Sequence, residues 1–265
     1  LGEGYWALTI NPEGTTLEIP VASANSYSRT LQPGWNMIGG VSQVTDFTNP
    51  QDNPDNSIIV GTLYGWNPTG FSYEVKTEIA PGQGYWVLTL AECQLTVGGD
   101  ATVPTAPQVI PAPEMVISLN LSAGAWHRNL EIGLDQSASS GLEPMDRALP
   151  PIGPQAQDYQ AHLVGGQYRL RRDIRPITDQ TVSWQIRISS PEPVQLTINS
   201  QEIPTGQELV ISDGQMEILL SAGMEMQLAS GKRELIISLR PLPKVVLQNY
   251  PNPFNPETWI PFELN

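Results

Sequence analysis

Apolar and polar residues alternate along much of the second half of the chain. The apolar side chains recur at every second position in several short runs, as expected for β-strands that are buried on one face. These alternating sets are Leu130, Ile132 and Leu134; Val182, Trp184, Ile186 and Ile188; Val194, Leu196 and Ile198; Met216, Ile218 and Leu220; and Leu235, Ile237 and Leu239. Turn-forming segments such as residues 203–206 and 212–214 separate the runs. The pattern predicts an antiparallel β-sandwich over residues 116–243.

The first part of the chain contains an internal repeat. The sequence GEGYWALT at residues 2–9 recurs as GQGYWVLT at residues 82–89, and a short β-like run follows each copy. A motif that would open such a unit, LQPGWNMIG, is found at residues 31–39. We therefore expect a β-rich repeat module over residues 31–103. The end of a preceding, truncated copy is expected over residues 1–30.

Prolines mark the boundary between the two predicted domains. Residues 104–115 carry prolines at positions 104, 107, 111 and 113, which favour an extended, semi-rigid linker. Residues 136–160 are also rich in proline and lack a regular period, so we expect a long loop that lies over the sheet of the sandwich. No segment combines a helical period with capping residues, and the predicted fold class is all-β.

The chain is acidic, with a formal net charge of −14 over 265 residues. Arg29 and Lys76 are the only basic residues before residue 128. Proteins that bind nucleic acids cluster basic residues against phosphates, so this composition argues against such a partner. No apolar run approaches the roughly 18 residues of a membrane-spanning helix, so we expect no membrane insertion. The single cysteine, Cys93, excludes an internal disulfide framework and is expected to be a small buried hydrophobe.

Local signatures of catalysis are missing from the sequence. There are two histidines, His127 and His162, and the motifs HExxH, GxSxG and GxxxxGK[ST] do not occur. We expect both histidines to be surface or strand-end residues, and the acids of residues 135–158 to be solvated or turn-forming. The chain is therefore predicted not to be an enzyme. A concave pocket in which a histidine or two of these acids converge would argue against that prediction.

Residues 46–56 place several hard oxygen ligands close together. Asp46, Asp52 and Asp55 could suit a calcium ion. The segment lacks the spacing and the glycine of an EF-hand loop, so Asx turns are the favoured interpretation. We predict no cofactor, with calcium at these three aspartates as the alternative.

Aromatic residues are concentrated before residue 90 and provide the best case for ligand binding. Exposed rings on a flat β-sheet could stack on sugars, and the candidates for such a polysaccharide site are Trp35, Tyr64, Trp66 and Trp86. Neighbouring residues of a strand point to opposite faces, so at least one member of each Tyr-Trp pair is expected in the core. Core packing is the favoured interpretation, and a carbohydrate-binding β-module attached to a secreted enzyme is the alternative.

The end of the chain contains a long proline-rich motif. It is formed by Asn249, Tyr250, Pro251, Asn252, Pro253, Phe254, Asn255 and Pro256. Together with the alternating run at residues 258–264, it resembles the start of the C-terminal immunoglobulin-like module of type IX secretion sorting domains and of the related flagellar hook-cap (FlgD-like) repeats. The resemblance implies a small β-sandwich that directs export and anchoring. We expect only its first strand here, over residues 244–265, so that the module is incomplete in this chain.

The GWN and GYW motifs of residues 31–89 resemble a β-rich repeat found upstream of such modules. The resemblances imply a fragment of a secreted or cell-surface bacterial protein. The expected function is structural and non-catalytic, namely display of the C-terminal module, whose complete form would engage the secretion and anchoring machinery. The expected architecture is a repeat module, an antiparallel β-sandwich and the first strand of a truncated immunoglobulin-like domain.

Overall fold

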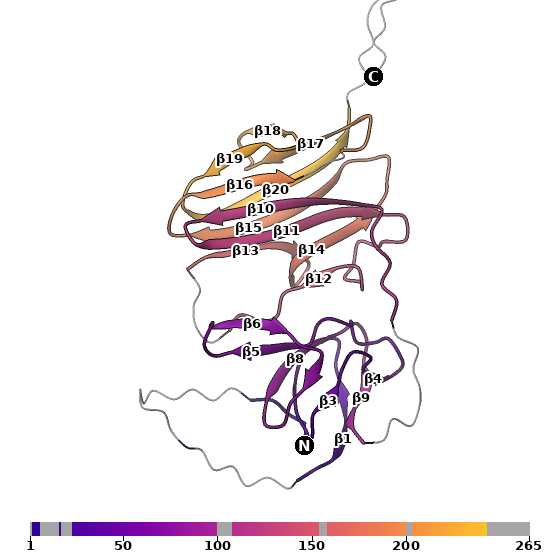
Figure 1. The fold of residues 1–265 in the computed structure, drawn as a ribbon. Helices are drawn as coiled ribbons and strands as arrows, with labels where there is room; N and C mark the ends of the chain where they lie inside the picture. Colours follow the sequence, from indigo (N-terminus) through magenta and orange to yellow (C-terminus); the bar gives the residue numbers. More distant parts are fainter. Residues whose placement is uncertain are drawn as a thin grey trace, which may run out of the picture. The chain divides into compact units, whose positions relative to one another are not determined.

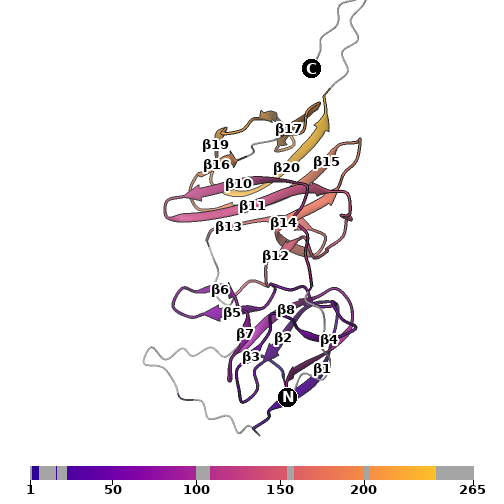
Figure 2. The same ribbon diagram turned by 45° about the vertical axis from the view of Figure 1, so that its right-hand side comes forward.

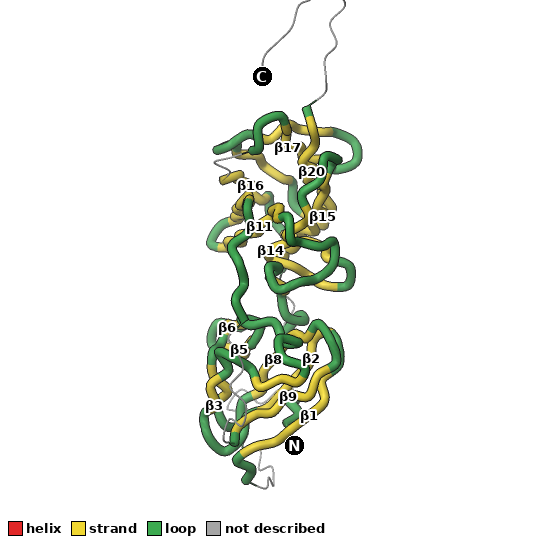
Figure 3. The backbone as a smooth tube through the Cα atoms, turned by 90° about the vertical axis from the view of Figure 1, so that its right-hand side faces the viewer, coloured by secondary structure: helices red, strands yellow, loops and turns green. Residues whose placement is uncertain are grey.

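The computed structural model describes residues 2–5, 16, 23–99, 108–153, 158–199 and 203–242 of the protein. Every regular element in these ranges is a β-strand (Figure 3). This confirms the all-β fold class that the alternating pattern predicts. None of the described segments forms a helix long and apolar enough to cross a bilayer. The predicted start of the immunoglobulin-like domain, residues 244–265 with the motif at 249–256, lies outside the described residues.

The chain divides into two compact units (Figures 1 and 2). Unit 1 comprises Leu1–Ala112, Ser139–Gln157 and Gly165–Arg172, and unit 2 comprises Pro113–Ala138, Asp158–Val164 and Asp173–Asn265. The chain thus passes from one unit to the other after residues 112, 138, 157, 164 and 172. The sequence alone suggested one boundary, at residues 104–115, because the later prolines gave no sign that their segment belongs with the first unit.

Unit 1 is built from short antiparallel strands. They are β1 (Ser26–Leu31), β2 (Gly34–Gly39), β3 (Thr45–Asp46), β4 (Gln51–Asn53), β5 (Tyr64–Asn67), β6 (Ser72–Val75), β7 (Glu78–Ile79), β8 (Gly84–Thr89) and β9 (Cys93–Gly98). One sheet has the order β2-β8-β5-β6, another β1-β9-β4, and β3 pairs with β7. Strand β1 pairs with β9 along its whole length. The unit therefore includes residues that precede position 31.

The hairpin of β5 and β6 shows how the sequence sets local structure. The tetrapeptide at residues 67–70 predicts a turn, and Asn67 opens it. The Asn67 side-chain oxygen Oδ1 accepts hydrogen bonds from the amides of Thr69 at 2.9 Å and Gly70 at 3.0 Å. The resulting register pairs Trp66 with Tyr73. The turn chemistry thus brings two aromatic residues of adjacent strands opposite each other.

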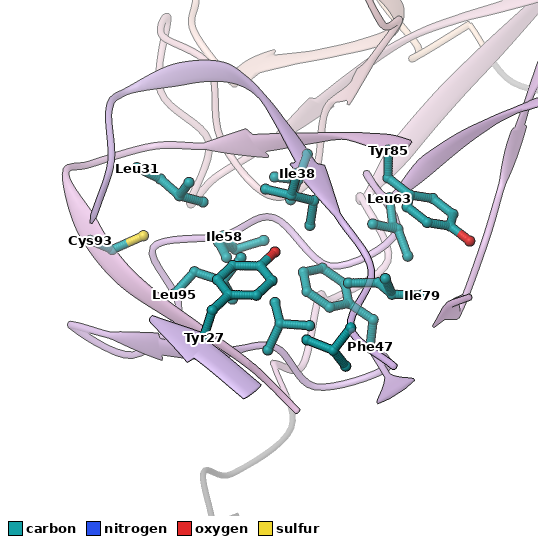
Figure 4. Packing of buried hydrophobic residues seen from close by; sticks show 13 residues of the cluster. Tyr27, Leu31, Ile38, Phe47, Ile58, Leu63, Ile79, Tyr85, Cys93 and Leu95 are labelled. Carbon is teal, nitrogen blue, oxygen red and sulfur yellow. The ribbon is translucent and has the colours of Figure 1, made fainter. Parts of the chain in front are cut away.

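Thirteen buried side chains of unit 1 form a hydrophobic cluster (Figure 4). Its members are Tyr27, Leu31, Ile38, Val41, Phe47, Ile58, Leu63, Ile79, Tyr85, Val87, Cys93, Leu95 and Val97. Cys93 is 2% exposed, which confirms that it serves as a buried hydrophobe, and burial raises the pKa of its thiol to about 11. A thiol with this pKa is protonated at neutral pH, so it is a poor nucleophile.

Unit 2 is built around one large antiparallel sheet. Its strands are β10 (Met115–Ala123), β11 (Trp126–Asp135), β13 (Gln160–Gly165), β14 (Tyr168–Pro176), β15 (Val182–Ser190), β16 (Val194–Asn199), β17 (Gln207–Ser212), β18 (Glu217–Leu220), β19 (Glu225–Leu228) and β20 (Gly231–Pro241). The order is β18-β17-β20-β15-β13-β14-β11-β10-β16-β19, and the short strand β12 (Arg147–Ala148) pairs with β14 beside this path. The division between the units passes through β13 and β14.

The sheet of unit 2 curls because its two edge strands are consecutive in the sequence. Strands β18 and β19 lie at opposite ends of the strand order, yet only residues 221–224 connect them. An extended connection of this length spans less than about 20 Å, so the two edges must lie close together, as Figure 1 shows. The Gly223 amide donates to the Ile198 carbonyl at 2.9 Å and thus fixes the connection against β16. The curl agrees with the predicted antiparallel β-sandwich.

The core of unit 2 follows the alternating pattern. Leu119 pairs with Leu130, and Trp184 pairs with Ile237, so their side chains share the buried face. The exception is Met216, which the pattern places inward but which is 67% exposed. Its amide donates to Asp213 Oδ1 at 3.0 Å in the turn before β18. The alternation of β18 therefore begins two residues later than the sequence suggests, at Ile218.

Candidate functional site

All four aromatic residues that were candidates for sugar binding lie on one face of a sheet in unit 1. In the order β2-β8-β5-β6, Trp86 stands opposite both Met37 and Tyr64. Residues directly opposite in adjacent strands point to the same face, and so do residues two positions apart in one strand. We call this surface the aromatic face; its rings are those of Trp35, Tyr64, Trp66, Tyr73 and Trp86, and each is half-buried. Tyr73 was not among the candidates.

The rings of the aromatic face contact one another edge to face. Trp35 and Tyr64 have ring centroids 5.8 Å apart at an interplanar angle of 63°. Trp66 and Tyr73 lie 5.0 Å apart at 71°. Each such pair contributes about 0.5–1.5 kcal/mol beyond the burial of its area. The rings are therefore packed against each other and are not coplanar.

Hydrogen bonds fix two of these rings further. The indole Nε1 of Trp86 donates to the Tyr73 hydroxyl at 3.0 Å. Burial raises the pKa of the Tyr73 phenol, and the hydrogen bond from Trp86 opposes this shift. Tyr73 thus stays protonated at neutral pH. The indole nitrogen of Trp86 and the hydroxyl of Tyr73 are thus joined by a hydrogen bond within the aromatic face.

A distant segment of the chain contacts the aromatic face. We call residues 139–153, which belong to unit 1, the returning segment. The Tyr64 hydroxyl donates to the Ala148 carbonyl at 3.1 Å. A Cβ added at Gly153 would lie 2.7 Å from Cζ3 of Trp66, so the Gly153 backbone rests against this indole. The sequence pattern predicts that these residues cover the sheet of the sandwich; the structure instead groups them with unit 1, where Ala148 and Gly153 contact the aromatic face.

The opposite face of the same sheet belongs to the core. Tyr85 is 6% exposed and lies in the buried cluster of Figure 4, whereas its neighbour Trp86 is on the aromatic face. The Tyr85 hydroxyl accepts a hydrogen bond from the Ala80 amide at 2.9 Å. This confirms that one member of the Tyr85-Trp86 pair is core. In the other copy, Tyr5 is exposed and Trp6 lies outside the described residues.

The aspartates considered for calcium bind amides of their own loops. Asp46 accepts hydrogen bonds from the amide and hydroxyl of Thr48 at 2.9 and 3.0 Å. Asp52 is buried, and its Oδ2 accepts from the Ile58 amide at 2.8 Å. Burial raises the pKa of Asp52. Asp55 Oδ1 accepts a hydrogen bond from the amide of Asn56 at 3.0 Å. In the part of the chain that the structure describes, no three His, Cys, Asp or Glu side chains gather as a metal site requires.

The two histidines lie in different surroundings on unit 2. His127 is exposed on β11, opposite Ser122. His162 lies on β13 and lines a groove of about 270 Å³. A pocket around a histidine is the feature that would argue for an enzyme. The groove around His162 is such a feature, and its lining holds one carboxylate, Glu234, which accepts a hydrogen bond from Arg187 Nε at 2.7 Å. The lack of catalytic activity therefore stays a prediction.

Sequence reasoning could find the aromatic residues but not their arrangement. The Tyr-Trp pairs and the turn at residues 67–70 indicated strands with rings on both faces. The contacts with Ala148 and Gly153 join positions more than 80 residues apart, for which the sequence holds no signal. A comparison with protein-family models, curated protein sequences and solved structures finds no match for this chain.

Proposed function

We propose that this chain is a non-catalytic structural region of a secreted or cell-surface protein. The observation that supports the proposal is that the rings of the aromatic face contact each other and the returning segment. These rings pack edge to face, and they contact the returning segment through the hydrogen bond from Tyr64 to Ala148 and the packing of Trp66 against Gly153. Such contacts support a role in holding a proline-rich segment in place, as a region that spaces or displays its neighbours would require.

Limited proteolysis tests this structural role. If the aromatic face holds the returning segment, the native protein should resist cleavage between residues 139 and 153, and Trp66→Ala should be cut there at low protease concentration. Phe71→Ala is the matched control, because Phe71 is an exposed aromatic residue at the tip of the same hairpin. Equal cleavage of the wild type and Trp66→Ala would contradict the proposal.

The proposed link to secretion rests on the sequence resemblance at residues 249–256. In this proposal the region leads into a C-terminal module that directs export and anchoring by the secretion machinery. A reporter fused before this chain, with the natural residues that follow it, should appear outside bacterial cells that carry the type IX machinery. Changing residues 249–256 to a Gly/Ser sequence should keep the reporter inside. Export of both fusions would contradict the link.

A carbohydrate-binding module is a second candidate, favoured by one observation. Trp35, Tyr64 and Trp66 share a sheet face with Trp86, as a platform for sugar rings would require. Affinity electrophoresis in gels that contain neutral polysaccharides separates the two proposals. The structural proposal predicts no retardation in any gel. Retardation that Trp66→Ala abolishes, with the unfolding midpoint of the protein unchanged, would favour the carbohydrate-binding module.

A further inference from the structure

The groove of about 270 Å³ lies on the outer surface of unit 2, across strands β13, β15 and β20. Two rows of cross-strand neighbours line it: Gln160, Ser189 and Lys232 form one row, and His162, Arg187 and Glu234 form the other. All six side chains share the outward face, because Ala161, Ile188 and Leu235, which alternate with them, are buried in the core. The register of three strands thus collects polar groups from positions that are more than 70 residues apart.

The groove is a basic site in an acidic protein. Three basic residues, Arg187, Lys232 and Arg233, line the groove against the one carboxylate of Glu234, whereas the whole chain has a formal net charge of −14. Clustered charge of one sign in a concave surface concentrates ligands of the opposite sign. The local balance of charge therefore favours an anion in the groove.

The single carboxylate of the groove is already engaged. Glu234 Oε1 accepts a hydrogen bond from Arg187 Nε at 2.7 Å, and its Oε2 accepts one from the side-chain Nε2 of Gln185 at 3.3 Å. Lys232 is exposed and forms no ion pair within the described ranges of the chain. Its ammonium group can therefore meet an anionic ligand without first breaking a salt bridge.

Neutral polar groups accompany the charges. The Gln160 amide, the Ser189 hydroxyl and the His162 imidazole face the same space as Lys232. Directed neutral groups of this kind recognise hydroxyl groups, and a few of them usually fix the orientation of a ligand in its pocket. The volume is just below the range of about 300–1,000 Å³ that is typical of ligand pockets. The ligand should therefore be small and carry both a negative charge and hydroxyl groups.

We infer that the groove binds a carboxylated sugar, such as one uronate unit of an acidic polysaccharide. The carboxylate lies toward Lys232, and the ring hydroxyls bind Gln160 and Ser189. The Arg187 guanidinium, a fork that suits carboxylates, already holds one in the form of Glu234. The inference concerns unit 2 alone and does not rest on the structural role proposed for the aromatic face.

Isothermal titration calorimetry with galacturonate, galactose and inorganic phosphate tests the inference on the whole chain. Galacturonate should bind with a measurable affinity, whereas neutral galactose should not, and phosphate should bind more weakly than galacturonate. Lys232→Gln should weaken galacturonate binding about tenfold, because a hydrogen bond to a charged group is lost. Glu234→Gln should strengthen it, because the carboxylate that competes for Arg187 is removed.

Arg171→Gln is the matched control, because Arg171 is an exposed basic residue assigned to unit 1. It should leave the affinity for galacturonate unchanged. Equal losses for Arg171→Gln and Lys232→Gln would reveal a general charge effect and overturn the inference. Equal binding of galactose and galacturonate, or tighter binding of phosphate, would also overturn it. Ser189→Ala, which changes no charge, should weaken binding of galacturonate but not of phosphate, and the opposite result would contradict the assignment to a sugar.

Discussion

The two units build their buried surfaces in different ways. Unit 2 uses long strands, such as β10 with nine residues and β20 with eleven, and its core is mainly aliphatic. The strands of unit 1 have at most six residues, and one face of its main sheet carries half-buried aromatic rings. Alternation along long strands sets burial in unit 2. In unit 1, burial depends on individual contacts, many of which join residues far apart in the sequence.

This difference has a consequence for stability. A long ladder of aliphatic pairs distributes the free energy of folding over many similar contacts, so that the loss of one exposed residue has little effect. The stability of a unit with short strands depends more on each close backbone contact and on each hydrogen bond. Substitutions at matched positions in the two units should therefore lower the free energy of unfolding by different amounts.

The largest effect should come from the centre of unit 2. Trp184 is fully buried, and its Nε1 donates to the Asp173 carbonyl at 3.1 Å. Trp184→Ala should lower the free energy of unfolding of unit 2 by about 3–5 kcal/mol, because it leaves a cavity and an unpaired carbonyl. Hydrogen exchange in denaturant, read separately for peptides of each unit, measures this change. Equal loss of protection in β2 and β8 of unit 1 would show that the two cores are not separate.

Two glycines with positive φ differ between the units in the space around them. Gly98 in unit 1 has φ +72°, and a Cβ there would lie 2.2 Å from the Asn25 carbonyl oxygen. Gly206 in unit 2 has φ +80° but no atom within 4 Å of such a Cβ. Gly98→Ala should cost about 2–4 kcal/mol from strain and the clash, and Gly206→Ala about 1–2 kcal/mol from strain alone. Thermal unfolding of the two variants checks this order, and equal costs would contradict it.

A single hydroxyl group tests the contact with the returning segment. Tyr64→Phe removes the hydrogen bond to the Ala148 carbonyl and leaves the ring in place. The free energy of unfolding of unit 1 should fall by about 0.5–1.5 kcal/mol. The matched control is Tyr168→Phe, because the Tyr168 hydroxyl accepts a hydrogen bond from the exposed side chain of its neighbour Gln167 at 3.0 Å. A loss as large for Tyr168→Phe would contradict a special role of Tyr64.

Two aspartates should make the stability of the two units depend on pH in opposite directions. Burial raises the pKa of Asp52 in unit 1. Its contribution to stability is therefore present below the ordinary aspartate pKa of about 3.9 and is lost as the pH rises through the raised folded value. In unit 2, the Ser137 hydroxyl and amide lower the pKa of Asp135, so its contribution is present above the ordinary value and is lost as the pH falls through the lowered one.

Unfolding followed separately in each unit between about pH 2 and 7 measures these dependences. Asp52→Asn keeps an acceptor for the Ile58 amide and should remove the decline of unit 1 with rising pH. Asp135→Asn should remove the decline of unit 2 with falling pH. Identical pH profiles for the wild type and both variants would contradict the two pKa shifts.

The sequence predicts unit 2 better than unit 1 for a physical reason. Leu235, Ile237 and Leu239 alternate with polar neighbours, and this period alone places them in the core. The order of strands in the curled sheet depends on contacts between distant residues, which a period does not encode. A smaller error of the pattern is Met216, which belongs to the turn at Asp213, so that the alternation of β18 starts only after it.

Contacts between distant residues also limit what the sequence predicts about the candidate sites. Tyr85 and Trp86 could be assigned to opposite faces because adjacent strand residues always diverge. Nothing in the proline-rich sequence of residues 139–153 indicates that it contacts Tyr64 and Trp66. The groove around Lys232 was also missed, because its eight lining residues become neighbours only through the register of β13, β15 and β20.

In the structural role that we propose, the aromatic face holds the returning segment. Native-state hydrogen exchange tests it most directly at two amides of that segment: Asp146, which donates to the Glu143 carbonyl at 3.0 Å, and Leu149, which donates to the Arg169 carbonyl at 2.7 Å. Trp66→Ala should accelerate exchange of both amides, whereas Phe71→Ala should leave them as slow as in the wild type. Unchanged exchange of Asp146 and Leu149 in Trp66→Ala would contradict the claim.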